Sequence, residues 1–360
     1  MDDKYVLLKG NEAIAEAALR AGCRFYAGYP ITPQSEILEY MSANMEKNGG
    51  VFYQAENEIA GMSMLFGAAA AGARVMSSSS GPGFDLMQEE ISYLSSNGIP
   101  AVLVNAMRYG TGDGEITAGQ DSYWLTTRGG GHGDSRQIVF APASVDECAQ
   151  LTYLAFDLAE KYRNVVIILT DGAVSQMIEK CRLPGRKEHD IDQFDWTLSG
   201  KPLGAKKNKL NNMTNIIGHS DYQKYLFEKY AEMFENEQRW ESLGVEDAEL
   251  LLVAYGISSR VCKTAVMEGR KKGIKLGLIR PITVWPFPRK AFEKIPDSVK
   301  GFVTVEMCVA TQLGLDVELT SKGRRALYSY LTGVNIPTAE GILAFCESIL
   351  SGKQKPTEVF

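Results

Sequence analysis

Short apolar runs alternate with helical stretches through the first half of the chain. Residues 101–107 (AVLVNAM) and 165–169 (VVIIL) are unbroken apolar runs rich in β-branched side chains, which is typical of strands buried on both faces. Residues 12–21, 58–72 and 146–161 instead have the composition and spacing of helices. This alternation predicts an α/β fold with a parallel sheet covered by helices on both faces.

Shorter elements fill the intervals between these segments. The helix over 58–72 (EIAGMSMLFGAAAAG) consists mainly of small residues and is expected to be largely buried. Further strands are predicted over 24–29, 51–54 and 74–76, and further helices over 37–45 and 87–96.

The segment 183–247 changes character and has few apolar runs. It holds one predicted helix that begins at Ser220, because Gln223 three residues later fits a capping box. Apolar side chains follow at helical spacing, at Leu226, Tyr230, Met233 and Trp240. This arm packs either on its own domain or on a partner subunit, and the sequence does not choose between the two.

A second α/β unit completes the chain. Its predicted strands cover 250–255, 275–279 and 301–305, and its helices cover 259–272, 289–294, 312–321 and 340–348. We therefore divide the chain into a first α/β domain at 1–184, a linker and helical arm at 185–247, and a second α/β domain at 248–360.

Length and charge agree with this division. A chain of 360 residues suits two domains. The net charge of −6 argues against a nucleic-acid-binding protein, which needs a basic face to displace counterions. No apolar run approaches the ~18 residues of a membrane span. The acidic start MDDKYVLLKGNEA does not have the pattern of a signal peptide, so we expect a cytoplasmic protein.

Cysteines and histidines give no sign of a metal site. The six cysteines form no CxxC pair, and the three histidines are dispersed. We expect reduced, buried thiols in a cytosolic protein, at Cys23, Cys148, Cys181, Cys262, Cys308 and Cys346.

Candidate chemistry lies in four loops that follow predicted strands. They cover residues 29–33 (YPITP), 54–58 (QAENE), 77–83 (SSSSGPG) and 108–114 (RYGTGDG). Taken singly, each has an ordinary structural explanation, such as a proline that ends a strand. Taken together, they cluster where open α/β sheets bind their ligands.

Three side chains in these loops suit an organic acid and a proton transfer. Thr32 offers a hydroxyl near a helix N-terminus, and Arg108 offers a planar fork for a carboxylate. Glu58 opens a helix almost free of charge, where a carboxylate is suited to exchange a proton. The alternatives are a surface ion pair for Arg108 and a helix-dipole contact for Glu58. Glu56 is the weaker candidate.

Several familiar motifs are missing. The chain has no GxxxxGK[ST] loop and no well-placed GxGxxG, which disfavours a nucleotide hydrolase and a Rossmann dehydrogenase. Neither GxSxG nor HExxH occurs. Residues 112–114 read GDG, as in the metal–diphosphate motif of thiamine enzymes, but no Asn pair follows at the expected distance. The chain is therefore expected to lack the half of such a site that holds Mg²⁺ and diphosphate.

The loops together resemble a known family. YPITP, QAENEIA, GAAAAGARVMSSSSGPGFDLMQE, NAMRYGTGDG and GGGHGDSR are similar to the α subunit of 2-oxoacid:ferredoxin oxidoreductases. LLLVAYGISSRV, IRPITVWPFP and VEMCVATQL continue the resemblance in the second domain, although Cys308 and Thr311 stand where the family often has Asn and Gly. The stretch GHGDSRQIVFAPASVDE looks most like the branched-chain type, and the 2-oxoglutarate type is the near relative.

The resemblance implies a fold and a shared cofactor site. The fold is a pyrimidine-type thiamine-diphosphate domain, doubly wound around a parallel sheet, followed by a domain like the C-terminal domain of transketolase. Thiamine diphosphate would lie between this chain and a β subunit that supplies Mg²⁺, and the [4Fe-4S] cluster would also belong to partner subunits. No metal ligand is expected here.

The resemblance also assigns roles to residues. Glu58 matches the glutamate that hydrogen-bonds the aminopyrimidine ring, and Thr32 and Arg108 match residues that hold the 2-oxoacid carboxylate. Further cofactor contacts are implied at Tyr29, Pro30, Ile31, Ser80 and Gly81.

The implied reaction is oxidative decarboxylation of a branched-chain 2-oxoacid, 3-methyl-2-oxobutanoate. Its products are acyl-coenzyme A and CO₂, and the electrons pass to ferredoxin. Implied partners are the β subunit, a γ subunit and a ferredoxin-like δ subunit, assembled as a dimer of the heteromer. Alternatives are 2-oxoglutarate, pyruvate or an aryl pyruvate. A second substrate carboxylate would need another cation, for which Arg128 and Arg136 are candidates. A non-catalytic scaffolding subunit is the alternative of another class.

Overall fold

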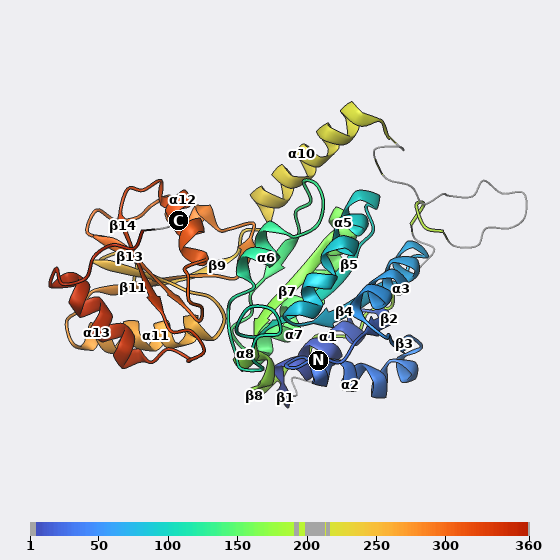
Figure 1. Ribbon diagram of the computed structural model, residues 1–360, viewed down its shortest axis with the longest axis horizontal. Helices are drawn as coiled ribbons and strands as arrows, with labels where there is room; N and C mark the ends of the chain where they lie inside the picture. Colours follow the sequence, from blue (N-terminus) through green and yellow to red (C-terminus); the bar gives the residue numbers. More distant parts are fainter. Residues whose placement is uncertain (1–4, 191–193, 199–212, 214–216, 359–360) are drawn as a thin grey trace, which may run out of the picture.

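The chain forms two α/β domains that lie side by side, and helix α10 (His219–Asn236) projects from the larger one (Figure 1). The computed structural model describes residues 5–190, 194–198, 213 and 217–358. No helix among these residues is long and apolar enough to cross a membrane.

A seven-stranded sheet forms the centre of the first domain, with the order β12-β6-β7-β5-β4-β2-β3. Neighbours from β3 to β6 run parallel, so the carboxyl ends of these strands meet at one edge. The strands are β2 (Cys23–Gly28), β3 (Val51–Gln54), β4 (Arg74–Ser79), β5 (Ala101–Met107), β6 (Ile138–Phe140), β7 (Val165–Asp171) and β12 (Thr283–Trp285).

Helices cover both faces of this sheet, which confirms the doubly wound arrangement (Figure 1). One face packs against α1 (Gly10–Arg20), α2 (Ser35–Asn44) and α7 (Val145–Tyr162). The other packs against α3 (Glu58–Ala70), α4 (Pro82–Leu86) and α5 (Gln88–Asn97). Smaller elements are η1 (Glu46–Asn48), α6 (Tyr123–Arg128), α8 (Gly172–Gln176) and an antiparallel ribbon of β1 (Tyr5–Lys9) and β8 (Ile178–Arg182).

The second domain has a five-stranded sheet with the order β14-β13-β10-β11-β9. Helices α11 (Gly256–Lys271) and α13 (Ala339–Leu350) cover one face, while α12 (Leu313–Ser321) and the first domain share a core on the other. The remaining elements are β9 (Trp240–Leu243), β10 (Leu250–Val253), β11 (Leu276–Pro281), η3 (Arg289–Phe292), β13 (Gly301–Glu306) and β14 (Ala326–Leu331).

Three features differ from the sequence prediction. Trp240 does not lie on the arm helix, which ends at Asn236; it begins β9, an antiparallel edge of the second sheet. Strand β4 continues through the serine run to Ser79 because each of these serines pairs with β5. Helix α3 is not largely buried, since Ile59 is 45% exposed and Ser63 and Gly67 are also exposed.

The domains are joined through a buried carboxylate. Asp171 at the end of β7 is fully buried; its Oδ1 accepts the Val174 amide and its Oδ2 accepts the Ile257 amide at 2.8 Å. Gly256 approaches so closely that a Cβ there would lie 2.2 Å from Asp171 Oδ2. Burial raises the pKa of Asp171, and the backbone amides oppose that rise.

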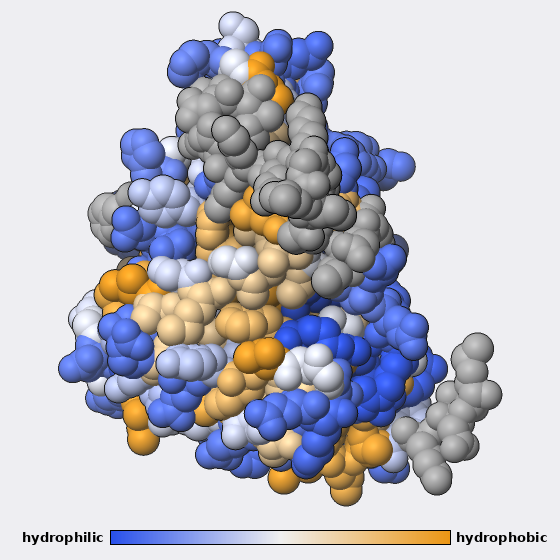
Figure 2. All heavy atoms as spheres, turned by 90° about the vertical axis from the view of Figure 1, so that its right-hand side faces the viewer, coloured by the Kyte–Doolittle hydropathy of each residue, from blue (hydrophilic) through white to orange (hydrophobic). Residues whose placement is uncertain are grey.

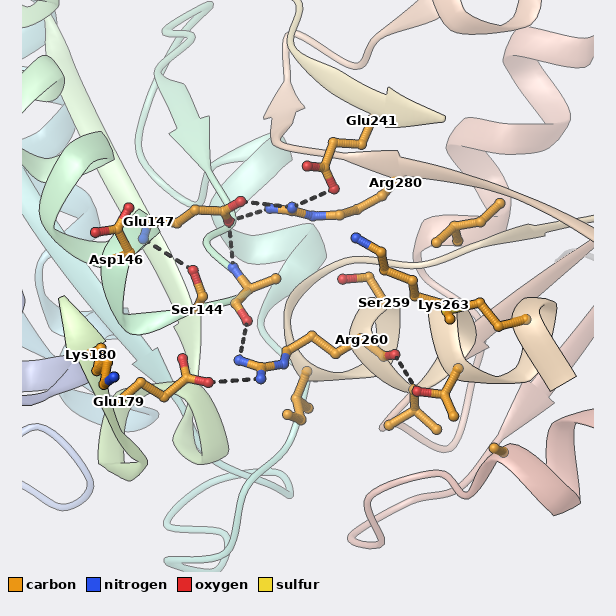
Figure 3. A pocket seen from close by; sticks show the side chains of 17 residues that line it. Ser144, Asp146, Glu147, Glu179, Lys180, Glu241, Ser259, Arg260, Lys263 and Arg280 are labelled. Carbon is orange, nitrogen blue, oxygen red and sulfur yellow. Dashed lines mark hydrogen bonds and ion pairs between the residues drawn. The ribbon is translucent and has the colours of Figure 1, made fainter. Parts of the chain in front are cut away.

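Beside this contact, a cleft of about 840 Å³ lies between the domains (Figure 3). Arg280 crosses it and forms ion pairs with Glu147 and Glu241, the latter at 3.0 Å. Arg260 reaches Glu179 at 2.7 Å on the opposite wall. The arginines that line the cleft are therefore already paired.

The arm helix α10 packs on its own chain. Met233 is fully buried in the core of the first domain, and Tyr230 packs edge-on against Trp285. Lys229 is also buried, and its Nζ donates to the Arg163 carbonyl at 3.2 Å and lies over the rings of Tyr225 and Tyr230. Burial, together with the Arg163 charge, lowers the pKa of Lys229 to about 7.

This lysine predicts a pH-dependent stability. Between pH 7 and 10.5 the unfolded chain binds a proton at Lys229 that the folded chain does not, so stability rises with pH. The expected slope from this one group is at most about 1.4 kcal/mol per pH unit. Denaturant unfolding of the parent chain and of Lys229→Met between pH 7 and 9 measures it, and the substitution is expected to lower the slope by that amount; the buried cysteine thiols, whose pKa values are raised by burial, add the same opposing slope to both chains. An unchanged slope in that variant would contradict a neutral buried lysine.

Candidate active site

Glu58 stands at the first position of α3, where the chain leaves the carboxyl end of β3. Asn57 caps the helix by accepting the Ala60 amide at 2.9 Å, which fixes the start of the helix. The Glu58 side chain is turned inward and is 6% exposed, whereas Glu56 is exposed. Ser79 Oγ donates to Glu58 Oε1 at 2.8 Å, which fixes one of the two carboxylate oxygens.

The serine run at the end of β4 sets the positions of the neighbouring strands and loops. Ser77 Oγ donates to the Ala27 carbonyl at 2.6 Å, and Ser78 Oγ donates to Gln34 Oε1 at 2.6 Å. Ser80 Oγ is buried and has no hydrogen-bond partner in the structure. Three successive hydroxyls therefore fix the neighbouring segments, and the fourth has no partner among the described residues.

Arg108 follows β5 on the other side of β4. Its Nη1 donates to the Thr32 carbonyl at 3.2 Å and its Nη2 to the Asp113 carbonyl at 2.5 Å. Its Nε is buried and has no hydrogen-bond partner in the described part of the chain. Gly81, at φ +48°, leaves room for this side chain, since a Cβ there would lie 2.8 Å from Nε.

The loop after β2 brings Thr32 to Arg108. Tyr29 and Pro30 are exposed, whereas Ile31 and Thr32 are half-buried. Gln34, fully buried, donates from Nε2 to the Tyr29 carbonyl at 3.0 Å and holds the loop closed. Thr32 precedes the start of α2 by three residues, as expected for a hydroxyl near a helix N-terminus.

Residues 79–83 thus contact both Glu58 and Arg108, and the predicted candidates share one edge of the sheet. Sequence reasoning missed three residues that hold them there: Ser79, Gln34 and Gly83. A Cβ at Gly83 would lie 2.0 Å from Glu58 Oε1. The SSSSGPG run at 77–83 could have indicated the roles of Ser79 and Gly83, because small residues allow a close approach of the backbone. The residues around Gln34 do not predict that its side chain is buried.

These residues fit a polar ligand such as an aminopyrimidine ring. Within the described residues, Ser80 Oγ and Arg108 Nε are buried donors without an acceptor, so each can donate a hydrogen bond to a ligand. The buried Glu58 carboxylate can accept a hydrogen bond from a ring nitrogen or an amine. Within the described ranges, no group of three or more His, Cys, Asp or Glu is placed to hold a metal ion. All six cysteines are buried and free.

Arg128 and Arg136, the candidates for a second substrate carboxylate, are engaged elsewhere. Arg128 donates to both carboxylate oxygens of Asp316, at 2.8 and 3.0 Å, and lies over the Tyr123 ring. Arg136 Nη1 donates to the carbonyls of Arg128 and Ser135. Among the described residues, neither guanidinium hydrogen-bonds the loops that carry Thr32 and Arg108.

An apolar surface continues from the site along the outer side of α3. Figure 2 shows a band of hydrophobic residues, bordered by hydrophilic ones, on the face that carries α3 and β3. Ile59 is 45% exposed on α3, and Val51 and Tyr53 are 55% and 48% exposed on the edge strand β3. A helix that is apolar all round is normally buried, so this face has the character of an interface.

The contact between Gly83 and Glu58 predicts opposite effects for two glycine substitutions. Gly83→Ala is expected to push the carboxylate away from Ser79 and to lower the free energy of unfolding by about 1–3 kcal/mol. Gly61→Ala, in α3, meets its nearest neighbour at 3.5 Å and is expected to raise it by about 0.5–1 kcal/mol. Denaturant unfolding of both variants is the measurement, and equal stability of the two would be the contrary result.

Comparison with known proteins places this geometry in a family. Residues 16–244 match the family described as pyruvate flavodoxin/ferredoxin oxidoreductase, thiamine diphosphate-binding. Residues 248–339 match pyruvate:ferredoxin oxidoreductase core domain II.

Known relatives of similar sequence belong to the same family. Ketoisovalerate oxidoreductase subunit VorB of Methanothermobacter marburgensis is 47% identical over 88% of this chain and 89% of its own length. The 2-oxoglutarate synthase subunit KorA of the same organism is 33% identical over 90% of this chain and 92% of its own length.

A solved structure shows the same fold. The chain matches 2-oxoglutarate:ferredoxin oxidoreductase from Magnetococcus marinus with a TM-score of 0.82 and 24% identity, over 97% of this chain. It spans 65% of that longer chain. The resemblance seen in the loop motifs and the expected fold class are thereby confirmed. The chain belongs to the family of thiamine-diphosphate-binding 2-oxoacid:ferredoxin oxidoreductase subunits.

Proposed function

We propose that this chain is the α subunit of a 2-oxoacid:ferredoxin oxidoreductase that acts on 3-methyl-2-oxobutanoate. The reaction converts the branched-chain 2-oxoacid and coenzyme A to acyl-coenzyme A and CO₂, with the electrons passed to ferredoxin. The observation that carries the proposal is the convergence of Glu58 and Arg108 on residues 79–83, where Ser80 Oγ and Arg108 Nε are buried and have no partner among the described residues.

Each residue has a role that follows from its chemistry. Bound thiamine diphosphate supplies the electron sink for loss of CO₂. Glu58 would hold the aminopyrimidine ring by a hydrogen bond and exchange a proton with it, because its carboxylate is buried and fixed on one side by Ser79. Tyr29, Pro30, Ile31, Ser80 and Gly81 would line the same ring.

The substrate carboxylate would be bound on the opposite side of residues 79–83. Arg108 would supply a charged donor, and its backbone contacts hold the guanidinium in place without neutralising it. Thr32 would add its hydroxyl. A carboxylate held at this point turns the keto carbon toward the cofactor, which is the orientation that decarboxylation needs.

The other half of the site would come from partner subunits. We propose that a β subunit holds Mg²⁺ and the diphosphate, and that the [4Fe-4S] cluster lies on a ferredoxin-like δ subunit or another partner. A γ subunit and pairing of two heteromers complete the assembly. The apolar face of α3 and β3, which begins at Glu58, is the surface we assign to the β subunit.

Two observations favour the branched-chain substrate. Identity to a ketoisovalerate oxidoreductase subunit is 47%, against 33% to a 2-oxoglutarate synthase subunit. The engagement of Arg128 with Asp316 also removes a candidate partner for a second carboxylate. Pyruvate and 2-oxoglutarate remain the alternative substrates, and scaffolding without catalysis is the alternative role.

Two further expectations stay proposals. The free, buried cysteines suit a reducing compartment, so we place the protein in the cytoplasm. We also propose the division into domains at 1–184 and 248–360, with 185–247 between them; two strands cross these bounds, since β9 joins the second sheet and β12 joins the first.

The function is tested by reconstitution with the partner subunits and reduction of a viologen dye. With 3-methyl-2-oxobutanoate, pyruvate and 2-oxoglutarate offered in parallel, the branched-chain acid is expected to give the highest kcat/KM. Glu58→Ala is expected to assemble normally and to lose at least about 100-fold in kcat, because the proton partner is removed.

Glu56→Ala is the matched control, since Glu56 is exposed two residues away, and it is expected to retain full activity. If the Glu58→Ala complex remained active, the scaffolding role or another acid would be favoured. A preference for 2-oxoglutarate would overturn the substrate assignment alone.

The partner surface is tested at Gly67, which is exposed on α3. A Cβ there meets nothing within 4 Å, so Gly67→Arg is expected to fold as well as the parent chain. Its bulk is expected to weaken assembly with the β subunit by about tenfold or more in Kd, measured by titration of the two chains. Gly185→Arg, at another open and exposed glycine, is the control and should assemble normally.

A further inference from the structure

Most of the loop that follows Arg108 is exposed to solvent. Residues 110–117 are all exposed, and glycines at 110, 112 and 114 lie at positive φ. Glycines lose the most conformational freedom on ordering, so such a loop needs firm contacts to keep one shape.

The shape of this loop decides where the Arg108 guanidinium lies. Tyr109 donates its amide to the Thr117 carbonyl at 3.0 Å, and Glu115 donates back to the Tyr109 carbonyl at 2.8 Å. The Asp113 carbonyl, at the tip, accepts Arg108 Nη2. Disorder in the loop would therefore release one of the two backbone contacts that orient the guanidinium.

The loop is anchored at its far end by Gln120, whose partners all belong to the second domain. The backbone N–H of Gln120 donates to the Met307 carbonyl at 2.8 Å, and the side-chain Oε1 of Gln120 accepts the backbone N–H of Met307 at 3.0 Å. The same Oε1 accepts Ser258 Oγ at 3.1 Å, and Nε2 donates to the Tyr255 carbonyl at 3.2 Å. Gln120 is 1% exposed, so these contacts are sheltered from water.

A second glutamine completes the anchor from the other side. Gln312, at the start of α12, donates from Nε2 to the Asp121 carbonyl at 2.8 Å and accepts the Trp124 amide on Oε1 at 2.8 Å. The backbone N–H of Gln312 donates to Glu306 Oε2 at 2.8 Å. Asp121 in turn accepts the Gly110 amide on Oδ2 at 2.7 Å, which ties the anchor to the first turn of the loop.

We propose that Gln120 and Gln312, here named the interdomain latch, are positioning residues for the substrate-carboxylate site: through them the second domain holds the 108–121 loop, and with it Arg108, in its binding orientation. The inference rests on the proposed role of Arg108.

The arrangement suits positioning better than general stability. The domains already share a large apolar core and the buried Asp171 contact, so the latch is not needed to keep them together. Its contacts hold residues 120, 121 and 124, at the end of the loop and just beyond it. Loss of the latch should therefore loosen the loop before it loosens the fold.

The test uses the reconstituted complex with Gln312→Met, because Gln312 is only half-buried and tolerates substitution better than Gln120. The expected result is an increase of about tenfold in KM for the 2-oxoacid, with kcat changed by less than about twofold. Amide hydrogen exchange on this chain should rise about tenfold at Tyr109 and Glu115 and stay unchanged in α7.

Gln238→Met is the matched control. Gln238 is also half-buried and also bridges two segments, since it donates to the Phe234 carbonyl and accepts the Lys290 amide at 3.0 Å, but it does not contact the 108–121 loop. It should leave both KM and loop exchange unchanged. Gln312→Asn keeps the amide on a shorter side chain and replaces Gln312→Met if that variant does not fold.

A double-variant cycle separates the two proposals. If the latch acts through Arg108, adding Gln312→Met to Arg108→Gln should raise KM no further. Should Arg108→Gln alone leave KM unchanged, the proposed role of Arg108 fails, and loop exchange still decides whether the latch holds the loop. Normal KM and normal loop exchange in Gln312→Met would overturn the latch, as would a loss of thermal stability without either change.

Discussion

The candidate site depends on one close approach, between the end of β4 and the first turn of α3. Ser79 donates to Glu58 at 2.8 Å, and Gly83 passes so near that a methyl group would displace the carboxylate. A buried carboxylate needs such a partner, because burial without hydrogen bonds is costly. The same segment reaches Arg108 through Gly81. One short stretch of backbone therefore sets the spacing between the acid and the cation.

Local patterns were sufficient to predict the sheet and the site loops. The apolar run at 101–107 is β5, and the loops at 29–33 and 54–58 do follow β2 and β3 at one edge of a parallel sheet. Thr32, Glu58 and Arg108 lie at this edge because parallel strands bring their carboxyl ends together. This required only periodicity and turn chemistry, which are encoded within a few residues.

Features that depend on distant partners escaped prediction. Trp240 fits a helical spacing, yet it lies in a strand because β11, far along the chain, offers an edge to pair with. The role of Gln120 cannot be predicted from its neighbours in the sequence, because its partner Met307 lies 187 residues away. The composition of α3 predicts burial, but the outer side of the helix is exposed, as expected if burial comes from another polypeptide.

Strand β12 gives the boundary between the domains an unusual form. Residues 283–285 belong to the second half of the chain, yet they pair with β6 and close one edge of the first sheet. In a fragment that stops before residue 283, the backbone donors and acceptors on this side of β6 would be unpaired and could pair with a strand of another molecule. The first half is thus an incomplete fold when synthesised alone, and during translation its sheet stays unfinished until the polypeptide has grown well beyond the arm.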